Sequence, residues 1–153
     1  MKIYTDGATS NNGYEGAIGG WAFAIISETG LCPVYEDSGR IEGATNNICE
    51  LTAIIKACQA TLHLDYINDM RGHHTIYSDS AYCINCYKQR WYKKWEKNGW
   101  INSQKKPVAN QELWELLIPF FEDPRFEFEY VKGHDTNKWN NYVDRKAVEA
   151  RGG

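Results

Sequence analysis

Long apolar runs are missing from this sequence. No stretch approaches the roughly 18 consecutive apolar residues of a membrane-spanning helix. The first residues, MKIYTDGA, also lack the basic-then-apolar pattern of an export leader. These two absences predict a cytoplasmic protein that makes no contact with a membrane.

Cysteine is present in an odd number, five, which argues against a framework of disulfides. Cys83 and Cys86 form a C-x-x-C motif, but no second pair stands at metal-binding spacing and no thioredoxin-like strand precedes it. We interpret the two residues as reduced thiols on one helix face.

Repeats and low-complexity tracts are missing too. The 153 residues, 42% apolar and 24% charged, are typical of one globular domain, predicted to span 1–153. The net charge of -3 is unevenly distributed: residues 88–106 carry seven cations and one anion, a balance of +6, which leaves -9 on the rest. A basic lobe therefore sits on an acidic body.

The spacing of apolar residues divides the chain into five strands and five helices. Their order predicts an α/β fold with a mixed five-stranded sheet, in which a three-stranded antiparallel meander precedes parallel crossovers and helices flank the sheet. Pro33 suggests an edge position for the third strand, and Pro119 a stop for the fourth helix, which Asn110 would cap. The predicted strands are 2–7, 21–27, 32–41, 73–79 and 125–133, and the predicted helices are 48–62, 81–87, 91–97, 111–118 and 140–149.

Two predicted strands end in the same short pattern, IYTD and IYSD, each with an aspartate last. Ligands gather beyond the carboxyl ends of parallel strands in an open α/β sheet. If the two strands are neighbours, Asp6 and Asp79 stand side by side there. A strand-end aspartate is also a common turn residue, so either one alone carries little weight.

Two further acids have no partner of opposite charge along their helices. Glu50 lies on the flank of an apolar stripe, away from the solvated face, and the residues three and four positions away are uncharged. Asp144 in the last helix likewise has only uncharged residues three and four positions away. A simpler explanation for Glu50 is a first-turn acid stabilised by the helix dipole.

Taken together, Asp6, Glu50, Asp79 and Asp144 suggest a metal site. Clustered carboxylates repel one another and stay ionised only around a cation. All-oxygen ligands favour Mg²⁺, with Mn²⁺ as a substitute. Two such ions roughly 4 Å apart would activate a water and stabilise the leaving oxygen in phosphoryl transfer. His134, in a loop ten residues before Asp144, is either an incidental surface residue or a proton shuttle beside the metals.

The order and spacing of seven motifs resemble those of bacterial-type ribonuclease H of type 1. They cover nearly the whole chain: YTDGA, TNNICELTA, IYSDSAY, WYKKWEKNGW, KKPVANQELW, VKGH and NYVDRKA. The resemblance implies a ribonuclease H-like fold and a monomer that needs no protein partner. It implies Mg²⁺-dependent hydrolysis of the RNA strand of RNA:DNA hybrids to 3′-hydroxyl and 5′-phosphate ends. The four acids would bind the metals, with Asp6 bridging them, and His134 would be the family's flexible-loop histidine.

The basic lobe resembles the protruding handle of that family, and residues 88–106 are called the handle below. Trp91 and Trp95 share a helical face among lysines. This pattern suits a nucleic-acid backbone, whose phosphates the lysines would neutralise, or a small aromatic core with a solvated lysine rim.

Residues before two helices resemble the family's substrate contacts. Asn46 and Asn47 match positions where amides read the 2′-hydroxyl of RNA, while Thr45 and Asn110 resemble part of a pocket for a DNA phosphate. Helix capping is the alternative for all four. The expected substrate-binding residues are Thr45, Asn46, Asn47, Trp91, Lys93, Lys94, Trp95, Lys97, Lys105, Lys106 and Asn110.

Two positions depart from the family pattern: Ala81 stands where many relatives have glutamine, and Gly43 where an arginine is often found. Both bear on affinity and site preference, because the four acids are intact. Two other functions remain open. A DNA-processing nuclease of the same fold, resolvase-like or integrase-like, would be expected to lack the handle. A catalytically silent hybrid-binding module would gain nothing from repelling acids.

Overall fold

A computed structural model describes residues 1–10, 16–68, 72–133 and 137–152. Along the chain, strands and helices alternate much as the apolar spacing predicts. The elements are β1 (Lys2–Ser10), β2 (Ile18–Ile26), β3 (Pro33–Glu42), α1 (Asn46–Asn68), β4 (His74–Ser78), α2 (Ala81–Lys88), α3 (Trp91–Asn98), α4 (Gln111–Phe121), β5 (Phe126–Tyr130) and α5 (Lys138–Ala150).

The five strands form one mixed sheet in the order β3-β2-β1-β4-β5. β1, β2 and β3 pair antiparallel, whereas β4 lies parallel to β1 and β5 parallel to β4. This arrangement confirms the predicted meander followed by parallel crossovers. β3, with Pro33 at its start, is an edge strand, where the missing N–H of proline costs no ladder bond.

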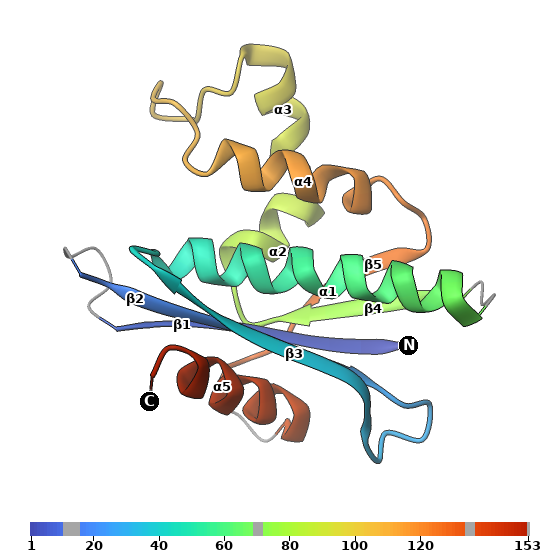
Figure 1. Ribbon diagram of the computed structural model, residues 1–153. Helices are drawn as coiled ribbons and strands as arrows, with labels where there is room; N and C mark the ends of the chain where they lie inside the picture. Colours follow the sequence, from blue (N-terminus) through green and yellow to red (C-terminus); the bar gives the residue numbers. More distant parts are fainter. Residues whose placement is uncertain (11–15, 69–71, 134–136, 153) are drawn as a thin grey trace.

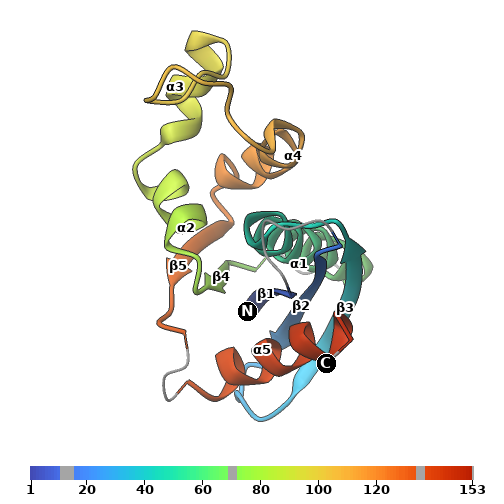
Figure 2. The same ribbon diagram turned by 90° about the vertical axis from the view of Figure 1, so that its left-hand side faces the viewer.

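Helices cover both faces of the sheet (Figures 1 and 2). α1 crosses one face and α5 the other, while α2, α4 and α3 extend away beyond α1, with α3 farthest from the sheet. The period of two along β1 explains the two layers: Ile3 packs under α1 in the larger core, and Tyr4 faces α5 in the smaller one. No helix within the described ranges is long and apolar enough to cross a membrane.

Two glycines bring the helices close to the strands. A Cβ on Gly7 of β1 would lie 2.5 Å from the backbone nitrogen of Glu50 in α1. A Cβ on Gly20 of β2 would lie 2.1 Å from the carbonyl oxygen of Ala147 in α5. Any side chain at either position would push a helix away from the sheet. Glycine at these two positions therefore allows α1 to pack closely on β1 and α5 to pack closely on β2.

A continuous series of aromatic rings joins the handle to the sheet. Trp95 of α3 contacts Trp114 of α4 edge-on, with ring centroids 5.5 Å apart. Trp114 in turn lies 6.4 Å from Phe121, and Phe121 lies 4.9 Å from Phe128 of β5. Trp114 and Phe128 are fully buried. The handle is thus anchored by the same hydrophobic core that packs against the sheet.

Some predicted boundaries are wrong. β1 does not stop at Gly7 but continues to Ser10, because β2 supplies ladder partners as far as Ile18. Pro119 lies inside α4 and does not end it, since burial of Phe121 holds the last turn in place despite one missing N–H donor.

One predicted helix cap and one predicted helix start also differ, although α4 begins at Gln111 as predicted. Asn110 precedes α4 in the left-handed conformation, with φ 62°, and its side chain makes no capping bond; asparagine tolerates this conformation better than most residues. α5 begins at Lys138, two residues early, because Asn137 caps it by accepting hydrogen bonds from the N–H groups of Trp139 and Asn140.

Candidate active site and nucleic-acid surface

Three of the four predicted metal-binding acids meet at one end of the central strands. Asp6 lies on β1, and Asp79 directly follows the parallel neighbour β4. Glu50 enters from the first turns of α1, across Gly7. Each side chain offers an oxygen, and these oxygens all lie within 4.8 Å of one another. Their common place follows from the parallel pairing of β1 with β4 and the close approach of α1.

Asp144 approaches the same place from the opposite face of the sheet. It lies on α5, is partly buried, and lines a pocket of about 430 Å³ together with the other three acids. It is also near enough to Asp6 to raise the pKa of that carboxyl group. We call Asp6, Glu50, Asp79 and Asp144 the acid cluster.

Hydrogen bonds fix the orientation of Glu50. The backbone N–H of Gly7 donates to Glu50 Oε1, and the hydroxyl of Ser78 donates to Oε2 over 3.4 Å. The Gly7 N–H also donates to Asp6 Oδ1 at 2.9 Å. The Ser78 hydroxyl in turn accepts a hydrogen bond of 3.0 Å from the backbone N–H of Ser80. The ends of β1 and β4 therefore orient Asp6 and Glu50.

Burial and mutual repulsion make the acid cluster a candidate site for a cation. Asp6 is 2% exposed, and its pKa is raised mainly by burial and then by the charges of Glu50 and Asp79. Burial likewise raises the pKa of Glu50, with Asp79 adding to the effect. A divalent ion would remove the repulsion and keep the carboxylates ionised. Oxygen is the only donor type offered by this group, which fits Mg²⁺ or Mn²⁺ better than a softer metal.

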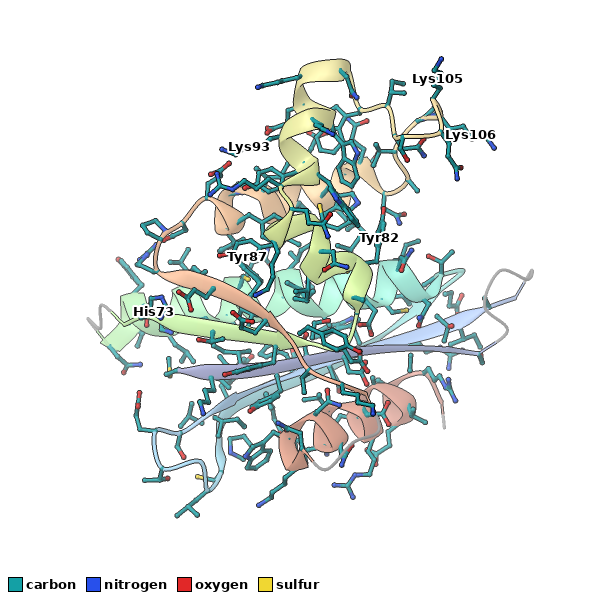
Figure 3. The ribbon with its side chains drawn as sticks, turned by 180° about the vertical axis from the view of Figure 1, so that it is seen from behind. His73, Tyr82, Tyr87, Lys93, Lys105 and Lys106 are labelled. Carbon is teal, nitrogen blue, oxygen red and sulfur yellow. The ribbon has the colours of Figure 1, made fainter. Side chains whose placement is uncertain are left out.

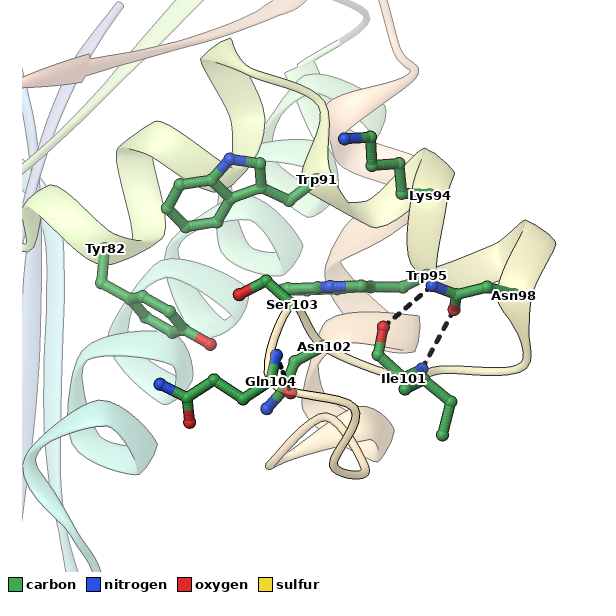
Figure 4. A pocket seen from close by; sticks show the side chains of 9 residues that line it. All are labelled: Tyr82, Trp91, Lys94, Trp95, Asn98, Ile101, Asn102, Ser103 and Gln104. Atoms are coloured by element: carbon green, nitrogen blue, oxygen red, sulfur yellow. Dashed lines mark hydrogen bonds between the residues drawn. The ribbon is translucent and has the colours of Figure 1, made fainter.

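The handle carries a groove in addition to its lysines. A cavity of about 540 Å³ lies between α3 and the loop 101–104 (Figure 4). Trp91, Lys94 and Trp95 line one side of it, and Tyr82 from α2 closes the end toward the sheet. Trp95 is only 8% exposed, so its main partners are other aromatic rings. The structure therefore shows an aromatic core rimmed by lysines. Binding of a nucleic-acid backbone by these lysines stays a prediction.

The lysines of the handle differ in their surroundings. Lys105 and Lys106 lie at the tip, far from the sheet (Figure 3). Lys93 is on another side of the handle, where its ammonium lies 3.6 Å from a carboxylate oxygen of Glu122. Lys94 and Lys97 have no acidic partner within 4.0 Å among the described residues.

The sequence matches the RNase H family over residues 1–151. The chain belongs to the ribonuclease H family. It is 41% identical to a ribonuclease H of Thermoanaerobacter sp. (strain X514) over 149 residues, which cover 97% of this chain and 88% of that protein. It is 37% identical to the ribonuclease H of Clostridium botulinum (strain Hall), covering 97% of this chain and 93% of that one. As a ribonuclease H, the protein is an endonuclease that hydrolyses phosphodiester bonds.

Solved ribonuclease H structures share this fold. LC9-RNase H1, a type 1 RNase H with the type 2 active-site motif, superposes with a TM-score of 0.74 at 25% identity, covering 99% of this chain and 71% of that chain. LC11-RNase H1, solved in complex with an RNA/DNA hybrid, superposes with a TM-score of 0.70 at 21% identity, covering 98% and 95%. The resemblance to a type 1 ribonuclease H is thereby confirmed.

The predicted substrate contacts of this ribonuclease H outside the handle lie at two helix starts. Thr45, Asn46 and Asn47 are exposed at the start of α1, and Asn46 lines the pocket of the acid cluster. The Thr45 hydroxyl accepts a hydrogen bond from the Ile48 N–H at 3.3 Å, so this residue also acts as a helix cap. Asn110 is partly buried before α4. The predicted His134 lies outside the described residues.

Sequence reasoning missed several residues of the site. Arg151, next to the C-terminal end of α5, lines the same pocket as the four acids. Ser78 and Gly7 donate hydrogen bonds to Glu50, and Tyr82 lines the handle groove. The repeated pattern IYTD and IYSD predicts that Ser78 lies in a strand, but it gives no sign of its hydrogen bond to Glu50. Arg151 carries no local signal at all, because its site contacts are with residues far away in the sequence.

Proposed function

We propose that this enzyme hydrolyses the RNA strand of RNA:DNA hybrids to 3′-hydroxyl and 5′-phosphate ends. The observation that carries the proposal is the convergence of buried and half-buried carboxylates within 4.8 Å beside an exposed amide-bearing helix start. The basic handle adds a second contact surface, as expected for a protein that holds a duplex. LC11-RNase H1, with the same fold, was solved with such a hybrid bound.

Asp6, Glu50, Asp79 and Asp144 would hold two Mg²⁺ ions, with Asp6 between them; Mn²⁺ would substitute. When bound, such ions supply an activated water and neutralise charge on the leaving oxygen. The acid cluster fits them because its donors are all oxygens and its buried carboxylates repel one another without a cation.

The remaining residues position the substrate. Asn46 and Asn47, beside the acid cluster, accept or donate hydrogen bonds to the 2′-hydroxyl, which is present only on the RNA strand. Thr45 and Asn110 hold a phosphate of the DNA strand at neighbouring helix starts. The lysines of the handle neutralise further phosphates, and His134 moves a proton or helps the product leave.

The deciding experiment incubates the full chain with an end-labelled RNA:DNA hybrid, with single-stranded RNA and with duplex DNA. Each substrate is tested with Mg²⁺ and with EDTA, and beside the Asp79→Asn variant. We expect cleavage of the hybrid RNA only, and only by the unmodified protein with Mg²⁺. Cleavage of duplex DNA would instead favour a resolvase-like enzyme. Binding of hybrid without any cleavage would identify a silent binding module.

A further inference from the structure

Arg151 stands out in the acidic pocket. Among the described residues that line this pocket, it is the only lysine or arginine, and the other charged residues are all carboxylates. No carboxylate oxygen of the described residues lies within 4.0 Å of its guanidinium. A cation that shares a pocket with four acids and pairs with none of them retains its charge for another anion.

The surroundings of Arg151 hold it in this position. Its Nη1 donates a hydrogen bond of 2.6 Å to the backbone carbonyl of Thr9, at the end of β1. Its backbone N–H caps α5 by donating to Ala147 at 3.2 Å, and the adjoining strand approaches closely because Gly20 has no side chain. Nε is buried without a hydrogen-bond partner among the described residues. The carbonyl of Thr9 is neutral, so this anchor orients the guanidinium without cancelling its charge.

A nucleic acid seated on the acid cluster would occupy the pocket that Arg151 also lines. Its phosphates carry one negative charge each, and arginine is well suited to them because its planar fork offers several N–H donors. Only one of the five donors is engaged by Thr9. The carboxylates around it repel a phosphate, so one fixed cation within the pocket offsets that repulsion where the strand enters.

We propose that Arg151 binds a backbone phosphate of the nucleic-acid strand that lies across the acid cluster. This inference rests on the proposed function and adds to it a phosphate contact borne by the end of α5. It makes Arg151 a substrate-binding residue. Asp144, seven residues earlier on the same helix, then acts on the strand that Arg151 holds.

The test measures binding of a fluorescently labelled RNA:DNA hybrid to the Asp79→Asn protein, which binds without cleaving, at constant Mg²⁺ and increasing KCl. Each phosphate contact contributes about one to the slope of log Kd against log salt. We expect Arg151→Gln to lower this slope by about one and to weaken binding several-fold. Arg151→Lys, which keeps the charge, should restore the slope. Arg145→Gln, an exposed arginine on the same helix, is the matched control and should leave it unchanged.

An unchanged slope in Arg151→Gln, or an equal loss in Arg145→Gln, would overturn the proposal. A lower melting temperature with an unchanged slope would show that Arg151 only fastens α5 to β1, which also overturns it. If Arg151→Gln does not fold, Arg151→Met keeps the apolar stem, removes the charge and repeats the measurement. The unmodified protein is assayed for hybrid cleavage in parallel. Failure there contradicts the proposed function, whereas cleavage with an unchanged slope contradicts only the role of Arg151.

Discussion

The backbone N–H of Gly7 donates a hydrogen bond to the carboxylate of Glu50. One residue without a side chain therefore does two things: it lets α1 approach β1, and it orients the acid that α1 carries. Gly7 consequently determines both the packing of α1 on the sheet and the geometry of the acid cluster. A shift of α1 at this residue would also move Glu50.

Gly7→Ala should lower both stability and activity. The new Cβ would lie 2.5 Å from backbone atoms of α1, which must move by several tenths of an ångström or more. Overpacking of this kind costs about 1–3 kcal/mol, and the displaced Glu50 should reduce the cleavage rate by more than the stability loss explains. Thermal unfolding and initial rates on hybrid measure the two effects.

Gly30→Ala is the control for that change. Gly30 has φ +74° in the turn before β3, with open space around it, so alanine there costs about 1–2 kcal/mol through backbone strain alone. Its rate should match that of the unmodified protein at temperatures where both are folded. Equal rates for Gly7→Ala and Gly30→Ala would show that α1 can shift without disturbing the site.

Asp6→Asn should stabilise the metal-free protein at neutral and alkaline pH. In the folded state the pKa of Asp6 is raised above its ordinary value of 3.8, so the folded protein retains a proton that the unfolded chain releases. The free energy of unfolding therefore falls as pH rises above about 4. In EDTA, the melting temperature of the unmodified protein should fall from about pH 5 to about pH 8 more steeply than that of Asp6→Asn.

Mg²⁺ provides the control for this prediction. A bound cation stabilises the ionised carboxylates, so millimolar Mg²⁺ should raise the melting temperature of the unmodified protein and leave Asp6→Asn with a smaller increase. An Asp6→Asn protein that melts below the unmodified one in EDTA at pH 8 would contradict the repulsion argument.

Two neighbouring lysines of the handle should contribute unequally to hybrid binding. Lys94 lines the groove, whereas the charge of Lys93 is partly neutralised by Glu122 at 3.6 Å. Lys94→Gln should therefore lower the slope of log Kd against log salt by about one, and Lys93→Gln by less. Titrations of both variants with the same hybrid make the comparison, and a larger effect at Lys93 would place the nucleic acid on the other side of α3.

A buried hydrogen bond between a histidine and an aspartate at the far end of β4 should matter for stability alone. His74 Nε2 lies 2.6 Å from Asp65 Oδ2, with the two side chains 1% and 4% exposed. Asp65→Ala leaves the buried imidazole without its hydrogen-bond partner, at a cost of about 1–3 kcal/mol. The melting temperature should drop by several degrees, with no change in cleavage rate at temperatures where the protein is folded.

His73 supplies the matched control for that substitution. It pairs with Glu127 across 3.6 Å, and both side chains are 55% exposed; Figure 3 shows His73 at this end of the molecule. Because exposed pairs contribute little, His73→Ala should change the unfolding free energy by less than about 1 kcal/mol. A comparable loss of unfolding free energy in Asp65→Ala and His73→Ala would contradict the argument that burial makes the first contact more important for stability.

The strands were predictable because their information is local. Alternation in FEFEY and the repeated strand endings IYTD and IYSD specify strands. That β4 lies beside β1 was only a condition at the sequence level, and the observed strand order supplies it. The convergence of Asp6 with Asp79 follows from that neighbour relation. Glu50 was recognisable for a similar reason, since its position on the helix leaves it no local partner.

The remaining features depend on contacts between distant residues. Arg151 donates to Thr9, 142 positions away, and no pattern near either residue indicates that contact. Pro119 is a helix breaker by local rules, yet burial of Phe121 extends α4 past it. The length of β1 beyond Gly7 depends on ladder partners from β2, which the glycines and polar residues of that segment conceal.

The aromatic series from Trp95 through Trp114 and Phe121 to Phe128 has a consequence for substrate length. Because these packed rings connect the handle to the sheet, we expect the distance between the lysines and the acids to be nearly constant. A duplex long enough to span this distance would contact both the handle lysines and the acid cluster of one molecule. A shorter duplex would contact only one of the two surfaces. Affinity should therefore rise abruptly at one threshold of hybrid length and then level off.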